Sequence, residues 1–161
     1  MANLNPDHLK AVMELINQSP FFSLLAMSVV DLGVGYSRVE VDLSSRHLNP
    51  FGGVHGGVYT SLIDTAAYWA VYCEIAEDAG FISLDVAVTM LSAVKEGHLL
   101  VEGKRIKTGR TVCIAEAAVF DERERCLAHG ISKQLVTPGL QTIDQALKSL
   151  GHKQLPPKFA V

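Results

Sequence analysis

The spacing of apolar residues along the chain changes between helical and strand-like periods, and these changes predict its elements. The pair Asn5-Pro6 is typical of a helix start, and Ser19-Pro20 of a helix end. Between the two pairs, apolar residues recur at helical spacing, so we expect an amphipathic helix there. These residues are Leu9, Val12, Met13 and Ile16.

Six further runs have the composition and length of β-strands. The first two, residues 27–32 and 37–43, flank Gly33-Val34-Gly35, which predicts a hairpin turn. The other four are joined by short polar segments, as antiparallel hairpins require. Those runs are residues 82–91, 98–106, 111–120 and 126–136, and their connections contain residues 95–97, 107–110 and 121–124. A short amphipathic segment follows at residues 143–150.

The longest candidate helix lies between the second and third strands and runs from Gly57 to about Glu77. It is apolar on nearly every face and should therefore be buried all round. A membrane span is disfavoured because Asp64 interrupts the apolar run and a positive flank is lacking. An antiparallel sheet wrapped around such a helix is an α+β fold, with the element order α-β-β-α-β-β-β-β. The length of 161 residues predicts a single domain, residues 1–161.

Charge and cysteine content argue against several classes of function. The 14 basic and 17 acidic side chains give a net charge of −3, and no basic run is longer than Lys104-Arg105, so we expect no nucleic-acid partner. The three cysteines are odd in number and lack C-x-x-C spacing, which favours neither a disulfide framework nor a zinc site. The first seven residues lack the pattern of a signal peptide, so we expect a cytoplasmic protein with no membrane partner.

Asp64 is the only formally charged side chain between Arg46 and Glu74, and it lies in the middle of the apolar helix. Burial of an unpaired carboxylate costs several kcal/mol, so such a residue usually has a reason to be there. One interpretation is a catalytic nucleophile or general base. The alternative is a satisfied core polar group that is hydrogen-bonded to Thr60 or Thr65.

A glycine-rich loop, residues 49–57, leads directly into this helix. Free N–H groups at a helix N-terminus attract developing negative charge, and an oxyanion hole can be built in this way. A nucleotide-phosphate cradle is disfavoured because the loop lacks both the P-loop lysine and the G-x-G-x-x-G spacing. His55 could be a base, but no G-x-S-x-G nucleophile and no second metal ligand accompany it. A role in orienting the loop is an equal alternative.

Taken together, these residues resemble the signature of hotdog-fold acyl-CoA thioesterases. The resemblance rests on Asn49, Gly52, His55-Gly56-Gly57 and Asp64, at offsets of 3, 6 to 8 and 15 from the asparagine. It covers about residues 20–136 and leaves the first helix and the tail outside. Asp64 stands where other hotdog branches have glutamate, and in this the chain is most similar to the phenylacetate-degradation thioesterases.

The resemblance implies a hotdog fold and a division of labour among the site residues. Asp64 would activate water or attack the thioester carbonyl, the Gly56-Gly57 region would polarise that carbonyl, and Asn49 and His55 would shape the site. Ser83 would orient the attacking water. The turn Lys107-Thr108-Gly109-Arg110-Thr111 would contact the nucleotide of coenzyme A. No metal or redox cofactor is expected, since coenzyme A would be part of the substrate.

Two other functions remain open at this point, a hotdog hydratase or dehydratase and a non-catalytic acyl-CoA-binding protein. The acyl group itself is not defined by the sequence. Four large side chains could line an aryl or medium-chain pocket, although aromatic residues on a buried helix are more often core. These are Tyr59, Tyr68, Trp69 and Met90.

Helix geometry also predicts the assembly. Gly57 and Asp64 are seven residues apart, which is about 10 Å along one helix. A base must act within ~3 Å of the carbon whose oxygen occupies the hole. We therefore expect a homodimer in which Asp64 of one subunit serves the helix N-terminus of the other. The family resemblance implies such dimers, often paired again into homotetramers.

Overall fold

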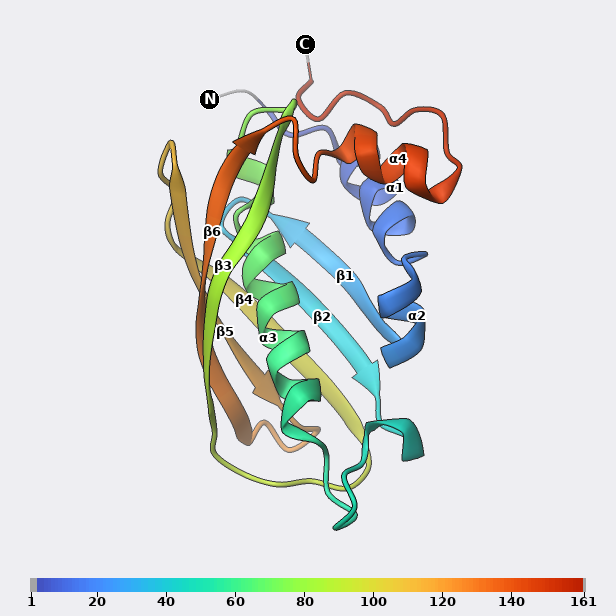
Figure 1. Ribbon diagram of the computed structural model, residues 1–161, viewed down its shortest axis with the longest axis vertical. Coiled ribbons are helices and arrows are strands. Elements are labelled where there is room, and N and C mark those ends of the chain that lie inside the picture. The colour runs from blue at the N-terminus through green and yellow to red at the C-terminus, as the bar shows by residue number, and fades with distance from the viewer. Residues whose placement is uncertain (1–2, 161) are drawn as a thin grey trace.

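A six-stranded antiparallel sheet curves around one long helix, α3 (Gly56–Ala70), in the computed structural model, which describes residues 3–160 (Figure 1). The strands lie within a few residues of the predicted runs, so the α+β class is confirmed. Their bounds are β1 (Met27–Gly33), β2 (Tyr36–Asp42), β3 (Ala79–Met90), β4 (His98–Lys107), β5 (Val112–Phe120) and β6 (Cys126–Pro138).

The strand order across the sheet is β1-β2-β4-β5-β6-β3, and it corrects one expectation. The segment around residues 95–97 does not close a hairpin, because β4 pairs with β2 and β3 pairs with β6 at the sheet edge. This connection instead crosses the end of the sheet beneath α3, where the Val94 carbonyl accepts a 3.0 Å hydrogen bond from the Val54 N–H. The hairpins β1–β2, β4–β5 and β5–β6 form as predicted.

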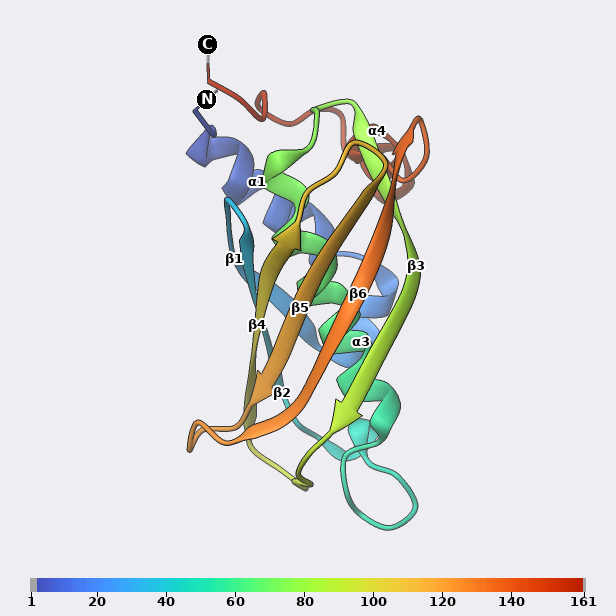
Figure 2. The same ribbon diagram turned by 90° about the vertical axis from the view of Figure 1, so that its left-hand side faces the viewer.

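Helix α3 packs its apolar side against the concave face of the sheet (Figure 2). Gly103 on β4 approaches the helix so closely that a Cβ atom there would overlap the Ala66 carbonyl. The strands thus touch the helix backbone, and only glycine fits at this crossing. The fully buried residues on this side include Leu62, Ile63, Ala66, Ala67 and Ala70.

Two expectations about this helix are wrong. It ends at Ala70, before a short 3-10 turn at Tyr72–Glu74, and does not continue to Glu77. It is also not buried all round, because the sheet covers only one of its sides. Gly57 is exposed, and the side chains that follow it on the same stripe are half-buried. These are Thr60, Ser61, Asp64, Thr65 and Tyr68.

Elements from the two ends of the chain lie beside the open side of α3 (Figure 1). The predicted first helix is confirmed as α1 (Pro6–Ile16), with the Asn5 side chain capping it by accepting from the Asp7 N–H at 3.1 Å. A second helix that the apolar pattern did not reveal, α2 (Pro20–Leu25), follows at once. The amphipathic segment near the C-terminus forms α4 (Ile143–Leu150). Within residues 3–160, no helix combines the length and apolarity that a membrane crossing needs.

The C-terminal tail is fixed by a buried lysine. Lys158 is only 1% exposed, and its ammonium donates to the backbone carbonyls of Tyr72 and, at 2.9 Å, Ile75. The same ammonium lies 4.1 Å from the centre of the Tyr72 ring. Burial lowers the pKa of Lys158 to about 8. The tail is thereby tied to the turn that ends α3, next to a β-bridge between Leu4 and Phe159.

Candidate active site

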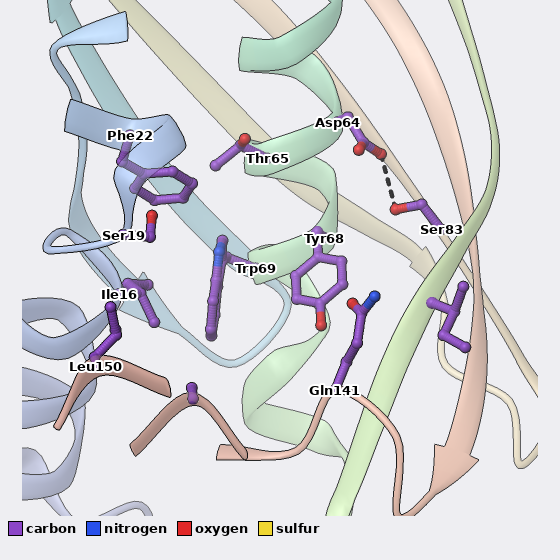
Figure 3. A pocket seen from close by; sticks show the side chains of 12 residues that line it. Ile16, Ser19, Phe22, Asp64, Thr65, Tyr68, Trp69, Ser83, Gln141 and Leu150 are labelled. Atoms are coloured by element: carbon purple, nitrogen blue, oxygen red, sulfur yellow. Dashed lines mark hydrogen bonds between the residues drawn. The ribbon is translucent and has the colours of Figure 1, made fainter. Parts of the chain in front are cut away.

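Asp64 lies halfway along the open stripe of α3 and is held by two hydroxyl groups. Its Oδ1 accepts hydrogen bonds from Ser83 Oγ on β3, at 3.1 Å, and from Ser132 Oγ on β6, at 2.9 Å (Figure 3 shows the first). The partners considered from the sequence, Thr60 and Thr65, are not its partners. Thr60 donates to the Gly56 carbonyl, and Thr65 faces the sulfur of Met27. The carboxylate is thus held by the sheet and not by its own helix.

Ser132 is a site residue that sequence reasoning missed. Its hydroxyl is fully buried, accepts a 2.9 Å hydrogen bond from the Gln134 side-chain amide, and also lies 3.1 Å from the Asp85 carbonyl. The one hydroxyl proton goes to Asp64, since the carboxylate is charged and lies nearer than the Asp85 carbonyl. A signal was present, because Ser132 and Gln134 occupy alternate, helix-facing positions of a strand whose other inward residues are apolar or glycine.

The loop before α3 is held in shape by its own side chains. Asn49 Oδ1 accepts from the backbone N–H groups of Phe51, at 2.9 Å, and Gly53, at 3.2 Å, in an Asx-type turn. Gly52 adopts a φ of +80°, which glycine allows without strain. The loop therefore reaches the helix N-terminus in a defined conformation.

His55 is the N-cap residue of α3, and its Nδ1 accepts a 2.8 Å hydrogen bond from the Gly57 N–H. This geometry matches the loop-orienting interpretation of His55. A Cβ atom at Gly57 would lie 3.0 Å from the ring, so a side chain there would require the histidine to shift by a few tenths of an ångström. In this conformation the Gly57 N–H is occupied, and it could receive an oxyanion only if the ring moved away.

The residues singled out in the sequence fall into three places in one chain. Asn49, His55, Gly56 and Gly57 meet at the N-terminus of α3, where Met90 also lies, with its Cε 3.0 Å from the position of a Cβ atom built at Gly56. Asp64 and Ser83 lie halfway along the helix.

The third place is the turn between β4 and β5, at the opposite end of α3. Its residues are Lys107, Thr108, Gly109, Arg110 and Thr111. Arg105, just before this turn, pairs with Glu74 beyond the helix C-terminus, with Nε and Oε2 2.9 Å apart. A single chain therefore does not bring the three groups into one site.

A cavity of about 470 Å³ opens beside Asp64 (Figure 3). Asp64 and Ser83 form part of its wall. Of the four predicted pocket residues, Tyr68 and Trp69 line it, whereas Tyr59 is buried in the core and Met90 lies at the helix N-terminus. The remaining wall comes mostly from the terminal elements. It includes Ile16, Phe22, Gln141, Ala146 and Leu150.

The two aromatic side chains of this wall are fixed by packing. Tyr68 and Trp69 meet edge to face, with ring centres 5.3 Å apart, and the Tyr68 hydroxyl donates to the Phe81 carbonyl at 3.2 Å. Burial raises the pKa of Tyr68 well above its usual value, so its hydroxyl stays neutral. In the described part of the chain, no group of three or more His, Cys, Asp or Glu side chains is placed to hold a metal ion.

Comparison with known proteins gives a consistent picture. A family model described as the thioesterase superfamily matches residues 51–128. A Saccharolobus solfataricus protein named as a candidate esterase is 27% identical over 126 residues, 78% of this chain and 83% of that protein. Acyl-coenzyme A thioesterase 13 of Mus musculus is 25% identical over 111 residues, 67% of this chain and 79% of the mouse protein.

Solved structures of the same architecture include two thioesterases. That of Haemophilus influenzae superposes with a TM-score of 0.76 at 20% identity, covering 88% of this chain and 98% of the other. Zebra fish thioesterase superfamily member 2 gives a TM-score of 0.70 at 24% identity, covering 80% and 98%. At these identities the likeness establishes the fold, and the sheet around α3 is a hotdog fold.

Proposed function

We propose that the chain is a thioester hydrolase of the thioesterase superfamily, that its substrate is an acyl-CoA, and that Asp64 acts as general base or nucleophile. The assignment of Asp64 depends on one observation. The Asp64 carboxylate lies at the edge of a cavity and is held there by hydrogen bonds from two hydroxyl groups on two different strands. The acyl-CoA substrate is supported by the name of the mouse relative and by the exposed cations Lys107 and Arg110 in the β4–β5 turn.

As a general base, Asp64 would take a proton from water while the resulting hydroxide adds to the thioester carbonyl. The tetrahedral intermediate would then collapse, the C–S bond would break, and coenzyme A would leave as the thiol after protonation. As a nucleophile, Asp64 would attack the thioester carbon, the C–S bond would break with release of coenzyme A as the thiol after protonation, and water would hydrolyse the resulting mixed anhydride to the acid and free Asp64. Ser83 and Ser132 donate to Oδ1, and no described residue donates a hydrogen bond to Oδ2, which leaves that oxygen available for either role.

The site needs a second subunit, because the helix N-terminus and Asp64 lie about 10 Å apart along one helix. We place the partner's α3 antiparallel to this one on the side of strand β3, away from the terminal helices, so that each Asp64 meets the other chain's Gly56-Gly57. Strand β3 supports this arrangement, since it is an edge strand of twelve residues whose second half is largely exposed. An edge of this kind readily pairs with a second chain. A further pairing into tetramers and membership of the phenylacetate-degradation branch stay predictions.

The proposal is tested by the substitution Asp64→Asn, which keeps the shape of the side chain but removes its basicity. We expect kcat on the best acyl-CoA to fall by at least ~10²-fold, with KM and the melting temperature nearly unchanged. Asp78→Asn, at an exposed loop position, is the matched control and should leave kcat unchanged. Near wild-type kcat in Asp64→Asn would refute the assignment. Acyl-CoA binding without turnover by the wild type would instead indicate a binding protein.

A further inference from the structure

We propose that the acyl group of the substrate occupies the cavity between α3 and the terminal helices, and that this cavity selects an uncharged acyl chain by length. The inference rests on the proposed function, since it assumes that Asp64 acts on a thioester. It goes further in assigning specificity to segments at both ends of the chain that lie outside the family match at residues 51–128.

The position of the cavity follows from the chemistry at Asp64. A base or nucleophile must come within ~3 Å of its water or of the thioester carbon. Asp64 and its partner Ser83 both line the cavity, so a substituent on that carbon lies at its opening (Figure 3). The phosphates of coenzyme A would be costly to bury in a cavity whose described lining residues include no cation, which leaves the acyl group as the part of the substrate that points inward.

The walls of the cavity explain why it would select acyl chains by their length. Phe22 of α2, Trp69 of α3 and Leu150 of α4 enclose the space from three elements. A second hollow of about 320 Å³ adjoins the first, and the two share five lining residues: Ile16, Tyr68, Trp69, Gln141 and Ala146. Ala146 has the smallest side chain of the five, so a larger side chain there would narrow the passage that a longer acyl chain would take from one hollow to the next.

The charges of the residues that line the cavity explain why the acyl chain should be uncharged. Among the described residues that line the cavity, Asp64 is the one with a formal charge, and the others are apolar or neutral polar groups. A carboxylate at the far end of an acyl group would be buried without a cation to pair with it, and its burial would be costly. The cavity should therefore reject acyl groups that end in a carboxylate.

The test compares kcat/KM for three substrates: butyryl-CoA, octanoyl-CoA and the analogue of octanoyl-CoA with a terminal carboxylate. Wild type should prefer octanoyl-CoA to its carboxylate analogue by at least ~10-fold. Ala146→Phe should lower kcat/KM for octanoyl-CoA by at least ~10-fold and leave butyryl-CoA within about twofold. Lys148→Phe places the same bulk on the exposed side of α4 and should change neither.

A second variant keeps the test decisive if Ala146→Phe does not fold. Leu150→Ala widens the cavity and should raise kcat/KM for dodecanoyl-CoA relative to octanoyl-CoA. The length assignment is overturned if both variants keep the wild-type ratios among chain lengths or change all substrates equally. Equal rates with octanoyl-CoA and its carboxylate analogue overturn the charge selection. If the wild type hydrolyses no acyl-CoA, the proposed function itself fails, and this inference fails with it.

Discussion

Ser132 on β6 places its hydroxyl 2.9 Å from Oδ1 of Asp64 on α3, across 68 residues of sequence. The contact joins the central helix to the strand next to the sheet edge. Gln134, which is fully buried, donates to the same hydroxyl and fixes its position. The orientation of the carboxylate thus depends on the inward face of β6, and this dependence can be measured.

We expect Ser132→Ala to lower kcat by about 10-fold or more, because a hydrogen bond to a charged group is lost from the carboxylate. KM should change little, since Ser132 would not touch the substrate. Ser37→Ala is the matched control: Ser37 is also buried and donates to the α3 backbone, at the Ala66 carbonyl, 2.6 Å away. The control should lose stability without a loss of kcat. Equal loss of kcat in both variants would show that Ser132 acts only through stability.

The β4–β5 turn should bind the phosphates of coenzyme A. Replacing both Lys107 and Arg110 by alanine should raise KM for acyl-CoA about 3- to 10-fold at low ionic strength, with less difference at high salt. Both side chains are exposed, so kcat and the melting temperature should stay near wild type. The double variant Lys10→Ala/Lys153→Ala removes the same charge elsewhere on the surface. An equal rise of KM in that control would mean that only net charge matters.

Lys158 should make stability depend on pH in a defined direction. Burial lowers its pKa to about 8 in the folded state, whereas an unfolded lysine titrates near 10.5. Between these values the unfolded chain binds more protons, so the free energy of unfolding should rise with pH across this window. The gain is on the order of 3 kcal/mol. Burial raises the pKa values of Cys73 and Tyr72 in the folded state, so these two groups lower the free energy of unfolding as the pH rises into the alkaline range.

The comparison of wild type with Lys158→Met removes the lysine and leaves Tyr72 in place, and the same comparison in a Cys73→Ala background removes the thiol whose charge is coupled to the lysine. Urea unfolding at several pH values from 7 to 10.5 should show that wild type gains stability relative to the variant as pH rises. A difference that stays constant over this range would contradict the lowered pKa.

The strands and α1 could be predicted from sequence because their signals are local. The Gly33-Val34-Gly35 turn and the Asn5-Pro6 start depend on neighbouring residues alone, and the structure confirms both. The place of β3 at the sheet edge depends on which strands pair over long distances, and the short polar connection before β4 carries no information about that. The sequence predicts too long a helix α3, because apolar residues continue past its end at Ala70 through the 3-10 turn at Tyr72–Glu74.

The candidate site was predicted unevenly for the same reason. Asp64 could be recognised as an isolated charge in an apolar helix, and the loop by its glycines. Ser132 could not be linked to Asp64 without knowing that β6 lies beside α3. The cavity wall from α1, α2 and α4 depends on how both chain ends fold back over the helix, which no local pattern encodes.

The most direct test of the account is complementation between two inactive variants. Asn49→Ala should inactivate the loop, since its Oδ1 orders the Phe51 and Gly53 N–H groups, and Asp64→Asn removes the base. If each site combines Asp64 of one chain with the loop of the other, a mixed dimer has one intact site. After equal mixing and complete subunit exchange, about half of the dimers are mixed and each has one of its two sites intact. The mixture should therefore recover about a quarter of wild-type activity. No recovery after verified exchange, or full activity in a monomer, would contradict the shared site.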